Sequence, residues 1–256
     1  QENYQIELIA KNIENKIKKE LENMLETERE KYEQFFTNFG MQLKYGIYSS
    51  YGMKKDQLKD LLLFKSSKEK KYVTLKEYIA NMSENQDKIY YACGESVDKV
   101  DLLPQVDAVK DKGYEVLYCT DYVDEFAIKM LQKYNDFELK NVCDENLELD
   151  SKEEQEELNK KNESSKDMFS IMKEAIPEVK DIRFTNKLKN HPVCLSSVGP
   201  VSVEMEKAMN AIPNEAGIKA ANETKKAGYA DKIMPPPVKG FDWNDYLNMK
   251  KGHKKS

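Results

Sequence analysis

The sequence contains few of the residues on which most enzyme chemistry depends. Only two of its 256 residues are histidine. His191 precedes a proline in an expected turn, and His253 lies among lysines near the end. No G-x-S-x-G, H-E-x-x-H, P-loop or G-x-G-x-x-G pattern occurs. These absences argue against nucleophilic, metal-dependent and phosphate-binding catalysis, and we assign no catalytic, cofactor-binding or metal-binding residue.

Long apolar runs, closely spaced cysteines and excess positive charge are also scarce. No run approaches the ~18 apolar residues of a membrane-spanning helix. The net charge is −5, with lysines interleaved among glutamates, which gives no attraction to nucleic acid. The cysteines lack the C-x-x-C spacing of metal or redox sites, so we expect free, buried thiols in a reducing cytoplasm. They are Cys93, Cys119, Cys143 and Cys194.

The middle of the chain carries the most informative pattern. Lys88 to Cys93 and Tyr114 to Cys119 are short runs rich in β-forming residues. Val97 to Lys112, between them, has apolar residues at helical spacing and ends at Gly113. A second amphipathic helix is expected from Tyr122 to Tyr134. Two strands joined by such a helix predict a βαβ unit with parallel strands.

Three helices are expected before this unit. Apolar residues recur at helical spacing over residues 4–25, from about 28 to 45, and over 55–64. Each predicted helix has one apolar face and a short connection, so the three should pack together as a small coil. Residues 65–71, KSSKEKK, have nothing to bury and are expected to form a loop.

The part after the βαβ unit begins with an acidic stretch. Residues 144–158 contain eight acidic residues and one lysine, which is typical of a solvated helix or linker and marks the expected domain boundary. A helix follows and ends at Pro177. Val179 to Thr185 and Pro192 to Ser197 are predicted strands, and Val201 to Ile212 a short helix.

Three segments also resemble a known family. KEYIANMSENQDKIYYACGES, KGYEVLYCTDYVDEFAIKMLQKY and MEKAM occur in the order and spacing of the heat-shock protein 90 chaperones, and are most similar to the bacterial form called high-temperature protein G. The resemblance extends from about Gln1 to Ile218. The remainder, which includes three consecutive prolines, departs from the family.

The resemblance, taken with the pattern, implies a fragment of such a chaperone with an α/β fold. A three-helix coil (1–68) precedes a small αβα sandwich with a parallel sheet (69–150), which together make the distal middle domain. A short α+β segment (151–220) would begin the C-terminal domain. Residues 221–256 are expected to be an atypical tail that is flexible or foreign to the family.

The family is an ATPase that uses ATP and magnesium, but the resemblance does not place that site here. Its nucleotide pocket lies in a separate N-terminal domain, and its middle domain contributes an arginine from a motif like S-R-E-x-L-Q. Arg29 and Arg183 are the only arginines of this chain, and neither lies in such a motif. We therefore expect a fragment without bound cofactor that does not hydrolyse ATP.

The function that the resemblance implies is binding of unfolded or partly folded client proteins, with relay of clamp motion. In the family the short amphipathic helix carries client-facing apolar residues, and flexible methionine suits such a surface. Those residues here are Val201, Met205, Met209 and Ile212. The same methionines could instead fill the contact with the middle domain. Co-chaperones are further implied partners, and a chain without the family's dimerisation helices should be monomeric.

Other hypotheses remain open at this point. Ligands of open α/β sheets bind at strand carboxyl ends, where this chain has residues 93–96 and 119–121, so a small-molecule enzyme is one alternative. A structural adaptor that binds one defined partner through the acidic helix and the aromatic tail is another. Asp124 and Glu125 are expected to complement the dipole at the start of a helix. The tyrosines around the βαβ unit, Tyr90, Tyr91, Tyr118 and Tyr122, are expected to serve its structure.

Overall fold

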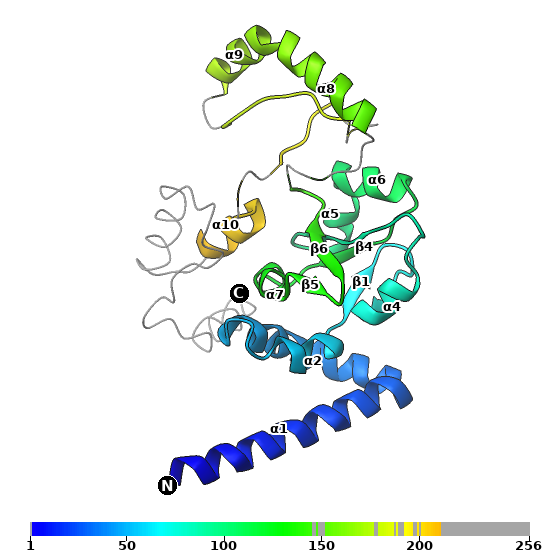
Figure 1. Ribbon diagram of the computed structural model, residues 1–256, viewed down its shortest axis with the longest axis vertical. Helices are drawn as coiled ribbons and strands as arrows, with labels where there is room; N and C mark the ends of the chain where they lie inside the picture. Colours follow the sequence, from blue (N-terminus) through cyan, green and yellow to red (C-terminus); the bar gives the residue numbers. More distant parts are fainter. Residues whose placement is uncertain are drawn as a thin grey trace, which may run out of the picture.

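The computed structural model describes residues 2–144, 147, 152–176, 179–186, 188, 192–196, 199 and 201–210 (Figure 1). Helices dominate its two ends, and the strands lie between them. In chain order the elements are α1 (Glu2–Thr27), α2 (Arg29–Ser49), α3 (Lys55–Leu58), a 3-10 turn (Lys59–Leu61), β1 (Phe64–Ser66), β2 (Tyr72–Val73), α4 (Leu75–Ala80), β3 (Lys88–Cys93), α5 (Val97–Asp101), α6 (Pro104–Asp111), β4 (Val116–Cys119), α7 (Asp124–Leu131), β5 (Lys133–Tyr134), β6 (Phe137–Asn141), α8 (Lys152–Ser164), α9 (Lys166–Ala175) and α10 (Val203–Asn210).

The strands form one mixed sheet in the order β2-β1-β4-β3-β6-β5. The central strand β3 is parallel to β4, with Tyr90 opposite Val116, and parallel to β6, with Tyr91 opposite Asn141. The predicted βαβ unit with parallel strands is therefore confirmed. The outer strands β1, β2 and β5 pair antiparallel with their neighbours.

Alternation along β3 and β4 divides the core into two layers. Because successive side chains of a strand point to opposite faces, Tyr91 and Leu117 belong to one layer and Tyr90 and Val116 to the other. The first layer includes residues of α2 and α7, and the second includes residues of α5 and α6. This arrangement is the predicted αβα sandwich. Tyr90, Tyr91 and Tyr118 are all buried, which agrees with their expected structural role.

The third N-terminal helix is shorter than predicted. The α-helix ends at Leu58, a 3-10 turn follows, and the run Leu61 to Phe64 is buried completely. A run in which every side chain is buried is typical of a segment that enters the central layer of a fold, because an amphipathic helix would expose one face. The expected loop over residues 65–71 is also partly wrong. Ser67 donates its backbone N–H to the Val116 carbonyl at 2.9 Å, and the predicted boundary at residue 68 falls inside the β1–β2 hairpin.

Two predicted helices of the sandwich also need correction. The single helix over residues 97–112 is two helices, because Pro104 lacks a backbone N–H and occupies the first turn of a new helix, α6. Gly113 follows with φ +79°, which explains the stop there. The helix expected to reach Tyr134 ends at Leu131, and the β5–β6 hairpin that follows extends the sheet.

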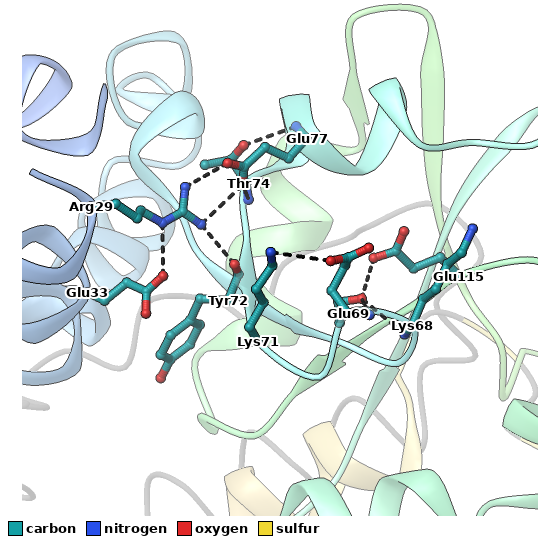
Figure 2. Close-up of polar contacts among 10 residues, drawn as sticks. Arg29, Glu33, Lys68, Glu69, Lys71, Tyr72, Thr74, Glu77 and Glu115 are labelled. Atoms are coloured by element: carbon teal, nitrogen blue, oxygen red, sulfur yellow. Dashed lines mark hydrogen bonds and ion pairs between the residues drawn. The ribbon is translucent and has the colours of Figure 1, made fainter. Parts of the chain in front are cut away.

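Arg29 connects the start of α2 to the hairpin and to α4 (Figure 2). Its guanidinium donates to Glu77 at 2.7 and 3.1 Å, to Glu33 at 2.9 Å and to the Tyr72 carbonyl at 2.8 Å. Glu77 also accepts from the backbone of Thr74, which caps α4 in return. The planar guanidinium thus fixes the relative positions of α2, the β1–β2 hairpin and α4.

The N-terminal half of α1 contributes nothing to the core. Ile6, Ile9, Ile13 and Ile17, which form its apolar stripe, are exposed, and burial begins only at Leu21. The predicted coil therefore forms through the C-terminal half of α1. None of the helices in the described part of the chain combines the length and apolar character needed to cross a bilayer.

After the sheet, α8 and α9 lie apart from the sandwich, while α10 returns to α7 (Figure 1). The strands predicted within residues 179–185 and 192–197 are absent from the described residues of those ranges; Ser197 lies outside them. Two isolated strands could not enclose a core by themselves. Pro177, the predicted helix stop, and the tail from 211 onward also fall outside the described residues.

Candidate functional site

Two of the predicted client-binding residues lie in a contact between α7 and α10. Met205 and Met209, one turn apart on α10, are 3% and 5% exposed and pack against Phe126 of α7. Val201 packs against the same cluster, together with Tyr48 and Ala208. Ile212 lies outside the described residues. In this conformation the methionines fill the contact with the middle domain, which is the alternative that the sequence left open.

A hydrogen-bond network holds the start of α10 against α7. The Ser202 hydroxyl accepts from the Met205 backbone N–H at 3.0 Å, which caps the helix. The same hydroxyl donates to the buried carboxylate of Glu125. Glu125 also accepts from Asn141 Nδ2 at 3.1 Å, and Lys129 Nζ lies 3.6 Å from its carboxylate. These three contacts of the carboxylate join α7 to its neighbours and to its own next turn.

A buried cation holds the opposite side of α7. Lys44 of α2 points into the core, where its Nζ lies 2.5 Å from Asp124 Oδ1 and 2.9 Å from Asp121 Oδ2. Burial alone would lower the pKa of Lys44, but attraction to Asp124 and then to Asp121 outweighs it and raises that pKa. The ammonium also lies over the rings of Phe36 and Phe64, at 5.4 and 5.2 Å from their centroids. The raised pKa favours the charged form of Lys44 at neutral pH.

Consecutive acidic residues thus connect α7 to two different elements. Asp124 pairs with α2, and Glu125 accepts a hydrogen bond from the residue that caps α10. The prediction that both complement the helix dipole accounts for their place in the first turn of α7. It does not account for their burial, which the dipole alone would not require. We call Lys44, Asp124, Glu125 and Ser202 the α7 junction.

The strand carboxyl ends, where an enzyme would bind its ligand, are occupied by local contacts. Ser96 accepts from the Lys99 backbone at 3.3 Å and caps α5, and Glu95 pairs with the Lys99 side chain. A Cβ added to Gly94 would lie 2.7 Å from Val100, so the backbone is already close-packed there. Within the described ranges, no group of three or more metal-ligating side chains gathers.

Four residues of the contact and the junction are not predicted from the sequence, and Lys44 is one of them. Phe126 is predicted only as part of an amphipathic helix, and Tyr48 lies beyond the predicted end of α2. Their rings meet edge to face with centroids 5.3 Å apart. Ser202 did have a usable signal, because a serine three residues before Met205 fits a helix N-cap.

Comparison with known proteins places this fold. A helical segment followed by a mixed sheet of this kind matches the middle domain of a Plasmodium falciparum heat shock protein, with a TM-score of 0.50 and 30% identity over 54% of this chain and 57% of that one. The class defined by the fold is therefore an α/β chaperone middle domain. The family model described as "Hsp90 protein" matches residues 1–234, and the chain belongs to the Hsp90 family.

Curated relatives agree with this assignment. The chain is 53% identical over 221 residues to "Chaperone protein HtpG" of Clostridium botulinum (strain 657 / Type Ba4). It is 51% identical over the same length to the protein of that name from Bacillus subtilis (strain 168). Each alignment covers 86% of this chain and 35% of the relative. The chain thus spans about a third of the length of the relatives that it matches.

Proposed function

We propose that this chain is the client-contacting and motion-relaying part of an Hsp90-type chaperone. The observation that carries the proposal is the apolar contact of Met205 and Met209 of α10 with Phe126 of α7. Both methionines are buried in this contact, so α10 is stabilised by its docking on α7. When α10 moves away, the three side chains become an apolar surface beside the charged residues of α7.

Several features of this surface suit unfolded clients. Methionine is unbranched and flexible, so two methionines one turn apart can adapt to many apolar sequences. Lys129 of α7 and Glu204 of α10 supply charge on the same two helices. Because the contact is between elements, its exposure depends on how the parts of the chain are placed and not on their unfolding.

The α7 junction supports the second half of the proposal, which is the relay of motion. Lys44 of α2 and Ser202 before α10 bond to adjacent residues of one short helix. A displacement of α2 therefore moves α7, and with it the partner of α10. In the full-length family this path would couple ATP-driven clamp closure to client remodelling.

The remaining features follow from the same proposal. The ATP and magnesium of the family would bind to another part of a longer protein, and this chain would have no hydrolytic activity of its own. Its partners would be unfolded or partly folded clients and co-chaperones, and we place it in the cytoplasm. We propose that the chain is a monomer, which light scattering tests, since a tight dimer would contradict it. Calorimetric titration with ATP tests the absence of a nucleotide site, since micromolar affinity would contradict it.

The client-binding test compares two methionine pairs in an aggregation-suppression assay. Met205→Asp with Met209→Asp should abolish protection of an unfolded substrate, because two charges then occupy the apolar surface. Met168→Asp with Met172→Asp is the matched control. These two methionines are also one turn apart, on α9, where they are 43% and 42% exposed. The control pair should leave protection unchanged.

Two outcomes would contradict the proposal. The first is a wild-type chain that protects no unfolded substrate. The second is that the double variant on α9 loses protection while the double variant on α10 keeps it in full, which would move the client surface to α9. Circular dichroism of both variants separates loss of binding from loss of fold.

A further inference from the structure

Two buried cysteines that are distant in the sequence lie side by side in the sheet. Cys93 ends β3 and Cys119 ends β4, and they are partners in the parallel ladder. Both point to the layer that contains α7, and they are 9% and 1% exposed. The sequence spacing argues against redox chemistry, but the fold brings the two cysteines to paired positions on neighbouring strands.

The geometry of this pair is compatible with a covalent bond. Partners on neighbouring strands have Cα atoms about 4.8 Å apart. A disulfide closes over Cα separations of about 4.4 to 6.8 Å. We propose that Cys93 and Cys119 are a peroxide-reactive dithiol that closes to a disulfide between β3 and β4.

The reaction proceeds in two balanced steps with hydrogen peroxide as the oxidant. The Cys93 sulfur, the more accessible of the two, attacks one peroxide oxygen. The O–O bond breaks, and Cys93 becomes a sulfenic acid with release of water. The Cys119 sulfur then attacks the Cys93 sulfur, the S–S bond forms, and the sulfenic oxygen leaves with a proton as a second water. Two thiols are oxidised and one peroxide is reduced.

The surroundings make oxidation of the pair slow at neutral pH. The neighbouring Cys119 thiol and burial raise the pKa of the Cys93 thiol, and burial raises the pKa of the Cys119 thiol. The reactive thiolate is therefore scarce at neutral pH. Burial also excludes bulky disulfides and admits only a small oxidant. Closure would join the strand ends on which α7 packs, and it does not depend on client binding.

The test uses the full chain with Cys143→Ser and Cys194→Ser, which leaves only the proposed pair. The folded protein is treated with hydrogen peroxide, alkylated, digested without reduction and analysed by mass spectrometry. We expect one linked peptide containing Cys93 and Cys119, with the mass of two hydrogen atoms lost. Both thiols should resist alkylation until dithiothreitol is added, and the rate should not depend on protein concentration.

Two controls make the result decisive. In the same background, Cys93→Ser or Cys119→Ser should give no link within the chain, and dimedone should trap a sulfenic acid on Cys93 when Cys119 is absent. The proposal is overturned if peroxide yields only separate sulfinic acids or links between molecules. It is also overturned if the link forms only in urea that unfolds the chain. Should the background variant not fold, peptide mapping of the wild-type chain gives the same assignment.

Discussion

Replacement of Lys44 by methionine should destabilise the chain more than loss of any exposed ion pair. The Lys44 side chain is 5% exposed and that of Asp124 is 2% exposed. With an effective dielectric constant of about 20, their 2.5 Å contact corresponds to about 7 kcal/mol of attraction. Burial of the two ions offsets most of this, at several kcal/mol for each.

The Lys44→Met variant loses the attraction between Lys44 and Asp124 but keeps the cost of burying the Asp124 carboxylate. In Lys44→Met, Asp124 remains buried without its cation, which typically costs about 3 to 5 kcal/mol. This is a large share of the total stability of a domain, about 5 to 15 kcal/mol. Addition of Asp124→Asn removes the stranded charge and keeps an oxygen that can accept from the Asp121 backbone N–H. The double variant should therefore be more stable than Lys44→Met alone.

Urea unfolding followed by circular dichroism measures these differences, and a constant slope shows that the same surface is exposed. Lys54→Met is the matched control, because Lys54 contacts Glu14 at 2.7 Å while both side chains are about half exposed. Its cost should stay below about 1 kcal/mol. The reasoning fails if Lys44→Met costs no more than Lys54→Met, or if Asp124→Asn restores no stability.

Two further predictions concern other polar contacts. Glu115 is buried beside Ser66, and burial raises its pKa above the ordinary 4.5 even though the Ser66 hydrogen bond lowers it. The folded state then holds a proton that the unfolded state loses, so the Glu115 contribution to stability falls as pH rises through and above 4.5. In urea titrations, the free energy of unfolding of Glu115→Gln should rise relative to that of wild type between about pH 4 and pH 7. A difference that does not change with pH would contradict this. Arg29→Lys should lower the free energy of unfolding by about 1 kcal/mol in the same assay, because an ammonium cannot contact Glu77 and the Tyr72 carbonyl together. An unchanged urea midpoint would show that the planar guanidinium is not needed for these contacts.

Local pattern was enough for the centre of the fold and not for its edges. β3 and β4 could be predicted because each is a short β-rich run that ends at a turn signal or a polar loop, with a helix between them. β1 could not, because its burial depends on pairing with β4 across the sheet. The four-residue apolar run that leads into it, Leu61 to Phe64, is equally compatible with a buried helix. Only the partner strand, about fifty residues later in the chain, decides between them.

The candidate site residues also differ in how far the sequence could predict them. Met205 and Met209 could be found from the resemblance and from their helical spacing, but their burial against Phe126 depends on a contact between distant segments. Lys44 gave no signal at all. A lysine within an amphipathic helix is normally solvated, and its burial is explained only by Asp121 and Asp124, far along the chain.

The geometry of α7 explains why two adjacent acidic residues can serve two partners. Consecutive residues of an α-helix point about 100° apart, so Asp124 and Glu125 cannot face the same neighbour. One therefore reaches Lys44 of α2, and the other reaches Ser202 and Asn141. Departure of Lys44 would leave the buried Asp124 without its cation, whereas departure of Ser202 leaves Glu125 with Asn141 and Lys129. A helix of eight residues can thus stay attached to α2 while its contact with α10 opens, as the proposed exposure of the methionines requires.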